Sequence, residues 1–312
     1  MKHYTSINDI DNLEEWIVDA KAIKKNPLEH RKLGKNKTLG LLFFNSSLRT
    51  RLSTQKAALN LGMNPIVMNV SNDSWGIEFG DGTVMDGTTA EHIKEAAAVV
   101  SQYCDIIAVR AFPTLTDKAK DESEEVLNAF KKYATVPIVN MESATAHPLQ
   151  GLTDALTISE YAKKERPKVV LTWAPHVKAL PHAVGNSFAQ VMQKMDVDFV
   201  ITNPEGYDLN PEITRDVPVL HNQEEAMKNA DFVYAKNWSS YENYGQILET
   251  NKSWMITKSL LGNAKFMHCL PVRRNVVVED AVLDSDSSLV IQQANNRTFA
   301  AQLVLKKLLE TL

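Results

Sequence analysis

The chain has 312 residues, of which 44% are hydrophobic and 23% are charged, and its formal net charge is −4. This composition is typical of a soluble globular protein with two domains, and it gives no electrostatic reason to expect nucleic acid or an anionic membrane as a partner. The two cysteines, Cys104 and Cys269, lie far apart, which argues against a disulfide framework or a cysteine zinc site. The N-terminal segment is polar and no apolar run has the length of a membrane span, so we expect a cytoplasmic protein.

Short apolar runs alternate with amphipathic segments in the first half of the chain. Apolar residues at helical spacing predict helices, and the short runs between them predict strands. Turn-forming residues predict a loop at 72–81, which contains Trp75. This alternation is typical of a mostly parallel sheet that is covered on both faces. The helices are expected near residues 10–24, 47–61, 91–103 and 122–133, and the strands at 38–44, 65–70, 105–110 and 136–141.

The second half of the chain repeats this alternation after a helix at about 148–161 and a basic boundary at 163–167. Further strands are expected at 169–174, 199–202, 217–220, 232–235, 265–269 and 289–291, and further helices near 184–195, 223–230, 254–262 and 278–284. The sequence therefore predicts an α/β protein with two doubly wound parallel-sheet domains linked by helices. We place these domains at residues 1–150 and 151–312, and we expect the C-terminal helix, about 298–312, to pack back on the first domain.

Residues 43–51, with the sequence FFNSSLRTR, join a predicted strand to a predicted helix in which Leu48, Leu52 and Leu59 recur at helical spacing. The first N–H groups of a helix lack partners and lie at the positive end of the helix dipole. Because hydroxyl and guanidinium groups surround this junction, it suits a phosphate. An ordinary N-capped helix with two exposed arginines is the alternative.

Ligands of open α/β sheets bind beyond the carboxyl ends of the strands. Four arginines are expected at such ends or in the adjoining loops, namely Arg49, Arg110, Arg273 and Arg297. Surface solubility explains any one of them, but four together favour a substrate with several negative charges. The chain has none of the motifs of P-loop kinases, dinucleotide-binding enzymes, zinc proteases or serine hydrolases.

Three motifs occur in an order that resembles the transcarbamylases, the family that transfers a carbamoyl group from carbamoyl phosphate to an amine. They are FFNSSLRTR at 43–51, HPLQ at 147–150 and HCLPVRRN at 268–275. The resemblance covers essentially the whole chain and implies one domain for carbamoyl phosphate and one for the amino acid. It also implies a homotrimer with shared active sites, and neither a metal nor a cofactor.

The resemblance implies roles for individual residues. Thr50, Arg110 and His147 would direct donors at the carbonyl oxygen, which becomes an oxyanion when the amine attacks. Gln150 and the backbone of Leu270 would hold the carbamoyl NH₂ group. The complete carbamoyl phosphate set implied by the resemblance is Ser47, Leu48, Arg49, Thr50, Trp75, Arg110, His147, Gln150, Cys269, Leu270 and Arg297.

Transfer to a neutral amine needs no nucleophilic side chain, so catalysis would depend on oxyanion stabilisation and on orientation, which is worth roughly 7–11 kcal/mol in favourable cases. The attacking amine must also lose a proton. Cys269 and the departing phosphate are both candidate acceptors, and a small buried hydrophobe is the alternative role for this cysteine. We therefore expect Thr50, Arg110, His147 and Cys269 to be the catalytic residues.

The second domain bears on the identity of the amine. Ornithine-specific transcarbamylases carry an S-M-G motif that holds a free α-amino group, and this chain has no such motif. The corresponding region contains Lys236, a cation suited to the α-carboxylate of a substrate whose α-amine is acylated. The region resembles the transcarbamylases of N-acylated ornithine, and in that subgroup Glu142, His176, Lys236 and Arg273 match positions around the acylated amino acid.

Ala90 bears on the choice of acyl group. Transcarbamylases of N-acetylornithine carry a glutamate at this position and a lysine at the position of Val277, whereas the succinyl type has proline in place of Ala90, so this chain departs from both. A glutamate would repel a second carboxylate, and alanine removes that charge, which favours N-succinyl-L-ornithine. The extra carboxylate would bind a cation, with His176, Lys178 and Arg273 as candidates. N-acetylornithine, and then ornithine itself, are the alternatives.

Two further features follow from the resemblance alone. The loop 175–181 resembles one through which this subgroup threads the chain after Lys236, which implies a deep knot in the C-terminal domain. Trp75 matches a loop residue that reaches the site of a neighbouring subunit. A binding module that senses an anionic metabolite without turnover is the alternative from another functional class, and the complete set of oxyanion donors argues against it.

Overall fold

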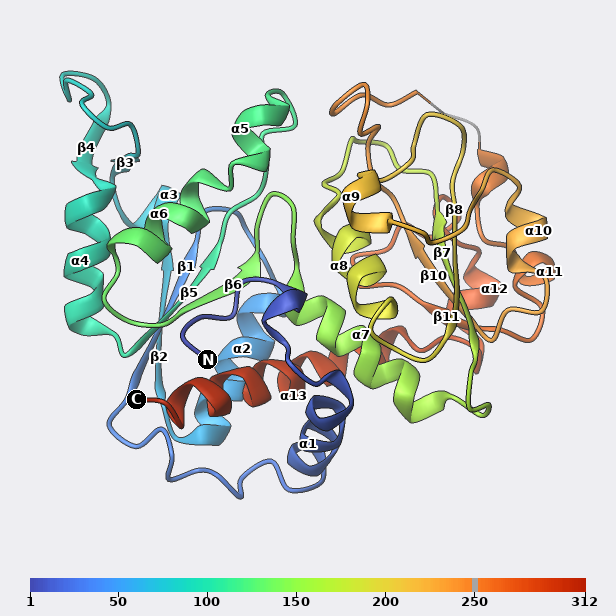
Figure 1. Cartoon of the computed structure of the whole chain (residues 1–312), viewed down its shortest axis with the longest axis horizontal. Coiled ribbons are helices and arrows are strands. Elements are labelled where there is room, and N and C mark those ends of the chain that lie inside the picture. The colour runs from blue at the N-terminus through green and yellow to red at the C-terminus, as the bar shows by residue number, and fades with distance from the viewer. Residues whose placement is uncertain (249–251) are drawn as a thin grey trace. The chain divides into compact units, whose positions relative to one another are not determined.

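The computed structural model describes residues 1–248 and 252–312 and divides into two compact units (Figure 1). The first unit contains Met1–Thr114, Ala119–Leu149 and Arg297–Leu312, and the second contains Leu115–Lys118 and Gln150–Asn296. Each unit has a parallel sheet with helices on its faces, which confirms the predicted α/β class. Within the described residues, no helix is both long enough and apolar enough to cross a membrane.

The sheet of the first unit contains β1 (Thr38–Phe43), β2 (Asn64–Asn69), β5 (Ile106–Arg110) and β6 (Ile138–Glu142). Their order is β2-β1-β5-β6, and all of these pairs are parallel. The strand order reverses between β1 and β5, and across this pair Arg110 lies beside Phe43. On its other side, Arg110 lies beside Glu142 at the end of β6. A ligand of a doubly wound sheet is expected at the carboxyl ends of such a reversal.

Helices cover both faces of this sheet (Figure 1). They are α1 (Leu13–Lys25), α2 (Arg49–Leu61), α4 (Ile93–Tyr103), α6 (Glu125–Tyr133) and the C-terminal part of α13 (Val290–Leu309), with the short η1 (Ile7–Asp9), α3 (Val70–Asp73) and α5 (Lys118–Glu122). On one face, Ile93 of α4 and Phe130 of α6 pack against Leu42. On the other face, α2 and α13 lie side by side, and the buried Asn60 donates a hydrogen bond to Gln302 at 2.9 Å. A separate pair of strands, β3 (Gly76–Glu78) and β4 (Thr89–His92), extends from the end of α3 to the start of α4.

The sheet of the second unit contains β7 (Lys168–Trp173), β8 (Asp198–Thr202), β9 (Val219–Leu220), β10 (Phe232–Lys236) and β11 (Lys265–Met267). Their order is β11-β10-β7-β8-β9, again all parallel, so the reversal lies between β7 and β10. Lys236 pairs with Trp173 at the carboxyl end of this reversal. The helices are α7 (Pro148–Tyr161), α8 (Ala183–Met192), α9 (Pro211–Thr214), α10 (Gln223–Met227), η2 (Lys252–Trp254), α11 (Lys258–Leu261), α12 (Asp280–Leu283) and the start of α13.

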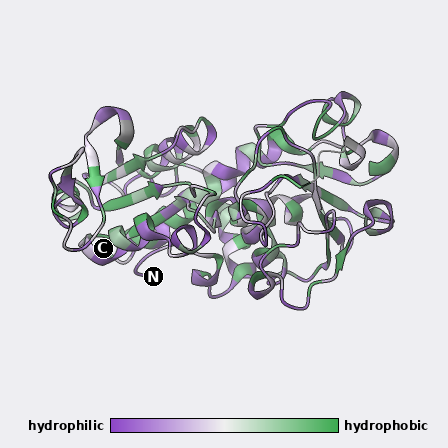
Figure 2. Cartoon of the chain, turned by 90° about the horizontal axis from the view of Figure 1, so that it is seen from above, coloured by the Kyte–Doolittle hydropathy of each residue, from purple (hydrophilic) through white to green (hydrophobic). Residues whose placement is uncertain are grey.

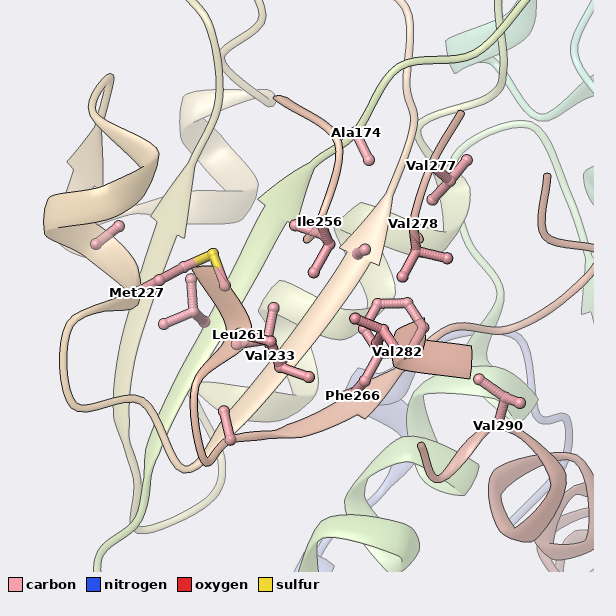
Figure 3. Packing of buried hydrophobic residues seen from close by; sticks show 14 of the residues in the cluster. Ala174, Met227, Val233, Ile256, Leu261, Phe266, Val277, Val278, Val282 and Val290 are labelled. Atoms are coloured by element: carbon pink, nitrogen blue, oxygen red, sulfur yellow. The ribbon is translucent and has the colours of Figure 1, made fainter. Parts of the chain in front are cut away.

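One apolar core of the second unit fills the space between its sheet and the short helices α10, α11 and α12 (Figure 3). Val233 and Phe266 project from the strands toward Leu261 and Val282 on the helices. The opposite face is covered by α8, whose Phe188 lies 4.3 Å from the Tyr234 ring, measured between centroids. Figure 2 shows that apolar residues are concentrated in the interior elements, because the strands are mostly hydrophobic and the loops are mostly hydrophilic.

The strand predicted at 289–291 is wrong. Ser288 makes one bridge to Phe266, and α13 then begins at Val290 and continues to Leu309, so the C-terminal helix is longer than predicted. Three apolar residues in a row fit a buried strand and the start of a helix equally well. Ile291 is 70% exposed while Val290 is buried, which is the pattern of a helix with one covered face.

Two predicted helices are interrupted. The helix expected at 122–133 is broken at Glu124, which has φ 52 and ψ 40 and separates α5 from α6. The helix expected near 254–262 is reduced to η2 and α11, where the Thr257 side chain accepts a hydrogen bond from the backbone of Leu260 and so caps the helix. The loop expected at 72–81 also contains the short strand β3.

The leucines that suggested α2 do not form its buried face. Leu48, Leu52 and Leu59 are all more than half exposed, whereas small residues such as Thr54 and Ala58 contact the interior. The helix is therefore where it was predicted, but its apolar stripe faces outward. The deep knot in the second unit stays a prediction. Ser239, three residues after β10, donates its backbone N–H to Leu180 O at 3.0 Å, which brings the two segments concerned into contact.

Candidate active site

The first unit places the start of α2 at the β1–β5 reversal. Leu48 is the N-cap residue in a helical conformation, and no side chain caps the helix among the described residues. The positive end of the helix is therefore left to its backbone N–H groups. Ser47 and Arg49 on either side of the cap are half-buried, so this junction is not the N-capped alternative considered from the sequence. It retains the groups that bind an anion at a helix terminus.

Thr50 and Arg297 add a buried donor pair to the same helix end. Thr50 is 3% exposed, and its hydroxyl accepts a hydrogen bond from NH2 of Arg297 at 2.6 Å. Arg297 lies on α13 and is also buried. The contact fixes a guanidinium group at the first turn of α2, where the helix dipole is already positive. Two sources of positive potential therefore coincide in a place from which water is largely excluded.

Arg110, Glu142 and His147 form a buried polar cluster at and after the ends of β5 and β6. Oε2 of Glu142 lies 3.1 Å from NH2 of Arg110 and 3.6 Å from Nε2 of His147. All three residues are more than nine-tenths buried. The Arg110 guanidinium also lies 4.5 Å from the centre of the Phe112 ring. A buried arginine is costly unless it is paired, so Glu142 stabilises the position of Arg110 and, at the same time, of His147.

Glu124, which was not predicted from the sequence, fixes the loop that leads from β6 to His147. Its Oε1 accepts hydrogen bonds from the Ser143 hydroxyl and from the backbone N–H of Thr145, both at 2.7 Å. Its Oε2 accepts a third from the backbone N–H of Ala144 at 3.2 Å. The left-handed backbone at Glu124 is unfavourable for a residue with a side chain. The local strain is offset by these contacts, which order the segment just before the histidine.

In the second unit, Lys236 and His176 lie at the β7–β10 reversal. Lys236 is buried and donates to its neighbour Asn237 O at 2.9 Å. His176 Nε2 accepts a hydrogen bond from Nε of Arg273 at 3.2 Å. Burial lowers the pKa of His176, and the positive charges of Lys236, Arg273 and Lys178 lower it further. A hydrogen bond to the backbone of Lys178 raises the pKa, but the net shift is downward. His176 is therefore neutral at pH 7 and acts as an acceptor for Arg273.

The HCLPVRRN loop is fixed at two points. Leu270, which has φ 57, donates its backbone N–H to Nδ1 of His268 at 2.8 Å. Further along, Arg274 binds Asp280 at 2.8 Å and Asp284 at 2.7 Å. Hydrogen bonds to Arg274 lower the pKa of both carboxyl groups. Cys269, which lies between His268 and Leu270, is partly exposed and is not in a disulfide.

Trp75 directly precedes β3, Ala90 lies in β4, and both residues are exposed. The register passes from Thr89 opposite Gly76 to Glu91 opposite Ile77, so Ala90 is the extra residue of a β-bulge. Nε1 of Trp75 donates to Glu91 Oε2 at 2.8 Å. The carboxylate of Glu91, next to Ala90, therefore already accepts a hydrogen bond from Trp75.

The structure thus gathers the predicted residues in two places. The first unit brings together Thr50 with Arg297, and Arg110 with Glu142 and His147, at the ends of adjacent strands. The second unit brings together His176 and Arg273. The described residues include no group of three or more histidine, cysteine, aspartate or glutamate side chains arranged to hold a metal ion. This donor-rich arrangement suits an anionic substrate in which negative charge develops on oxygen.

Comparison with known proteins identifies the family. Residues 2–160 match the carbamoyl-P binding domain of aspartate/ornithine carbamoyltransferase, and residues 181–308 match its Asp/Orn binding domain. The chain belongs to this family. The chain is thus a carbamoyltransferase. It is 50% identical over 317 residues to the N-succinylornithine carbamoyltransferase of Bacteroides fragilis, with 100% of both chains covered. It is 36% identical over 335 residues to the N-acetylornithine carbamoyltransferase of Xanthomonas axonopodis pv. citri, covering 99% of this chain and 96% of that protein.

Solved structures give the same result for this carbamoyltransferase. A variant of N-acetyl-L-ornithine transcarbamylase, in which one glutamate is replaced by valine, was crystallised with carbamyl phosphate and N-succinyl-L-norvaline. It matches the chain with a TM-score of 0.93 at 36% identity, over 99% of this chain and 100% of that one. The corresponding alanine variant, with the same two ligands, matches with a TM-score of 0.91 at 37% identity and the same coverage.

Proposed function

We propose that the chain transfers the carbamoyl group of carbamoyl phosphate to the δ-amine of N-succinyl-L-ornithine, giving N-succinyl-L-citrulline and phosphate, as a step of arginine biosynthesis. The observation that carries this proposal is the full-length identity of 50% to an N-succinylornithine carbamoyltransferase, against 36% to an N-acetylornithine carbamoyltransferase. The charged groups described above give the proposal a physical basis. Each half of the reaction corresponds to one group of residues.

The first unit supplies the residues for the phosphate and the carbonyl oxygen of carbamoyl phosphate. The phosphate binds at the uncapped start of α2, through Ser47, the backbone of Leu48, and Arg49. Arg110 and His147 donate to the carbonyl oxygen as the amine attacks, and the pairing of both with Glu142 holds them in place before substrate arrives. Donors fixed in advance in a dry site stabilise the oxyanion without reorganisation.

The transfer breaks the bond between the carbamoyl carbon and the phosphate oxygen and forms a bond to the δ-nitrogen. The neutral amine attacks the carbon, the carbonyl oxygen becomes an oxyanion beside Arg110 and His147, and phosphate leaves with the bonding electron pair. The proton lost by the δ-nitrogen passes to the thiol of Cys269 in its ionised form or to the departing phosphate. Gln150 and the backbone of Leu270 hold the carbamoyl NH₂ group throughout.

The second unit supplies the site for the acylated amino acid. Lys236, which ends β10, binds the α-carboxylate. Of the three candidates for the distal carboxylate, His176 is neutral because its pKa is lowered, so it contributes by accepting the Nε–H of Arg273. This bond leaves the two NH₂ groups of the guanidinium at the far end of the side chain. We place the succinyl carboxylate on Arg273 rather than on Lys178, because a guanidinium group binds a carboxylate through two parallel N–H groups, whereas an ammonium group is a point charge.

Ala90 explains the preference for succinyl over acetyl. The acetyl-type enzymes resemble this chain but carry a glutamate at this position, and such a charge would repel the second carboxylate. We take this to be the glutamate that is replaced in the solved variants crystallised with N-succinyl-L-norvaline. The neighbouring Glu91 accepts a hydrogen bond from Trp75 at 2.8 Å.

We also propose that the enzyme is a homotrimer in which the β3–β4 pair serves the site of a neighbouring copy. Leu48, Leu52 and Leu59 on α2 and Ile66 on the edge strand β2 are 66%, 58%, 55% and 51% exposed. Large apolar side chains exposed on neighbouring elements are typical of a surface covered in the assembly. Replacement Leu52→Glu should give monomers in sedimentation analysis, whereas Val18→Glu on α1, where the valine is 61% exposed, should leave the assembly intact. A monomeric, fully active wild type would exclude the trimer.

The deciding experiment is an assay of carbamoylated product with N-succinyl-L-ornithine, N-acetyl-L-ornithine and L-ornithine as acceptors. We expect the succinyl compound to give the highest kcat/KM. Faster turnover of the acetyl compound would transfer the assignment to N-acetylornithine, and turnover of ornithine alone would overturn the assignment to acylated substrates. Phosphate release that never exceeds the amine-free background would instead favour a binding module.

A further inference from the structure

A carboxylate in the interior of the second unit is bound by two amide side chains. Asp154 lies on α7 and is fully buried. Its Oδ1 accepts hydrogen bonds from Nε2 of Gln150, one turn earlier on the same helix, and from Nε2 of Gln293 on α13, both at 2.7 Å. Gln150 and Gln293 are each 1% exposed. A buried aspartate is rare unless its charge is satisfied, so this arrangement requires an explanation.

The hydrogen bonds continue from Gln293 to the loop that carries Leu270. Oε1 of Gln293 accepts the backbone N–H of His268 at 3.0 Å, and Nδ1 of His268 accepts the backbone N–H of Leu270 at 2.8 Å. The network therefore begins at one proposed carbamoyl-binding residue, Gln150, and ends at another, Leu270. Asp154 joins the two branches of the network, because it accepts from Gln150 on one side and from Gln293 on the other. All of these residues belong to the second unit.

The chemistry of a carboxylate decides how the two amides are turned. A carboxylate oxygen that carries no proton only accepts hydrogen bonds, and Oδ1 of Asp154 accepts from the NH₂ group of each glutamine. The oxygen of Gln150 is therefore turned away from Asp154, and the oxygen of Gln293 is turned to the backbone of His268, as observed. The carbamoyl NH₂ group is a donor and needs acceptors. Under the proposed function these acceptors are the amide oxygen of Gln150, whose NH₂ group is held by Asp154, and the carbonyl of Leu270, whose backbone N–H is held by His268.

We propose that Asp154 is a positioning residue that selects the NH₂ group of carbamoyl phosphate, by fixing the amide oxygen of Gln150 and, through Gln293 and His268, the carbonyl of Leu270. This inference rests on the proposed function in taking carbamoyl phosphate as the donor substrate and Gln150 and Leu270 as the residues that hold its NH₂ group; it is independent of which acylated amine accepts the group. A neutral amide in place of Asp154 could offer an NH₂ group to Gln150, and the glutamine would then turn its oxygen inward.

The chain offers a matched control one turn further along the same two helices. Nδ2 of Asn296 donates to Oγ1 of Thr157 at 3.0 Å and to Oε2 of Glu160 at 2.8 Å, so α7 and α13 are joined there by a second polar contact. Asn296 and Thr157 are both fully buried. Replacement Thr157→Val removes one of these bonds with little change in shape. If Asp154 serves only to join the helices, the Thr157 variant should behave like the Asp154 variant.

The test compares two acyl phosphates that differ in the group beside the carbonyl. Carbamoyl phosphate has NH₂ where acetyl phosphate has CH₃, and both have the same phosphate. Titration calorimetry on the full-length enzyme without amine gives the dissociation constant of each. In Asp154→Asn, we expect the constant for carbamoyl phosphate to rise about tenfold, the effect of one lost or reversed polar contact, and that for acetyl phosphate to change less than about twofold. Thr157→Val should change neither constant, although it lowers the melting temperature.

Three outcomes would overturn the inference: an Asp154→Asn enzyme that keeps the wild-type preference for carbamoyl over acetyl phosphate, one that loses affinity for both equally, or a Thr157→Val enzyme that loses the preference too. If Asp154→Asn does not fold, Gln293→Leu replaces it, since this variant interrupts only the branch to Leu270 and should lose part of the preference. Failure of the proposed function would be recognised separately, because the wild type would then bind neither acyl phosphate or would not transfer the carbamoyl group.

Discussion

The two strand reversals of this protein carry charged groups in different ways. In the first unit, Arg110, Glu142 and His147 are buried and contact one another. In the second unit, His176 is half-buried, Arg273 is exposed, and both lie on loops after strands. Buried charges are costly unless they are paired, whereas exposed charges can be replaced with little loss of stability.

The difference corresponds to the two substrates. Carbamoyl phosphate is common to the whole family, and oxyanion stabilisation requires donors that are already in place when the amine attacks. The acyl group differs among relatives, such as the succinyl and acetyl types, and the residues assigned to it, His176 and Arg273, lie where substitution is tolerated. Lys236 is buried, and it is assigned to the α-carboxylate that both acceptors have. We infer that the buried cluster determines the rate and that the exposed residues determine the specificity.

Replacing Arg110 should give the largest effect and tests the buried side of this comparison. Arg110→Gln removes an oxyanion donor, so we expect kcat to fall about 10²- to 10³-fold. It also leaves Glu142 buried without its arginine, which should lower the free energy of unfolding by about 3–5 kcal/mol. Adding Glu142→Gln should restore much of the stability but none of the activity, as measured by chemical denaturation and steady-state kinetics. Activity that returned together with stability would mean that Arg110 is structural.

The exposed side of the comparison is tested at Ala90. Ala90→Glu introduces a negative charge that repels the second carboxylate, and we expect the ratio of kcat/KM for the succinyl and acetyl substrates to fall about tenfold. Ala90→Gln has the same size without the charge, so it separates repulsion from crowding and should change the ratio little. The melting temperature should be unchanged in both, because the residue is exposed. If both variants reduced succinyl turnover equally, the size of the side chain at position 90, rather than its charge, would determine the preference for the acyl group.

The features predicted from sequence are those that depend on local pattern. Alternation gave the parallel sheets, and the rule that ligands bind at strand ends directed attention to Arg110 and His147, which the structure indeed places beside adjacent strand ends. The rest depends on tertiary contacts. The role of Glu124 follows from a left-handed backbone and from a loop about 20 residues later in the chain. Neither leaves a periodic signal in the sequence.

Hydrophobic spacing was also ambiguous where burial could not be known. The outward leucines of α2 have the spacing of a core face, and the start of α13 has the composition of a strand. In both cases the sequence specifies which residues are apolar but not what covers them. A surface between copies of the chain and an interior core produce the same pattern.

A smaller effect is expected at Glu124, which supports the buried cluster from outside. Glu124→Gln keeps the size of the side chain but replaces an acceptor of four hydrogen bonds by an amide that can accept with one atom only. We expect kcat to fall about threefold to tenfold with little change in KM, and the free energy of unfolding to fall by about 1–3 kcal/mol. Glu122→Gln, at an exposed position of α5, is the matched control. An unchanged kcat would show that the loop before His147 is ordered without Glu124.

The smallest effect is expected from the titration of His176, which affects only the exposed side. Because its pKa is lowered from 6.5, the neutral form that accepts from Arg273 is fully present above about pH 6.5. It is lost as the pH falls through the lowered value, and the new positive charge then repels Arg273. We expect N-succinyl-L-norvaline, which lacks the δ-amine, to bind about twofold to fivefold less tightly in the presence of carbamoyl phosphate as the pH falls below this range. His176→Gln retains an acceptor that does not titrate, so its binding should be flat over the same range. A variant with the same slope as the wild type would show that another group titrates.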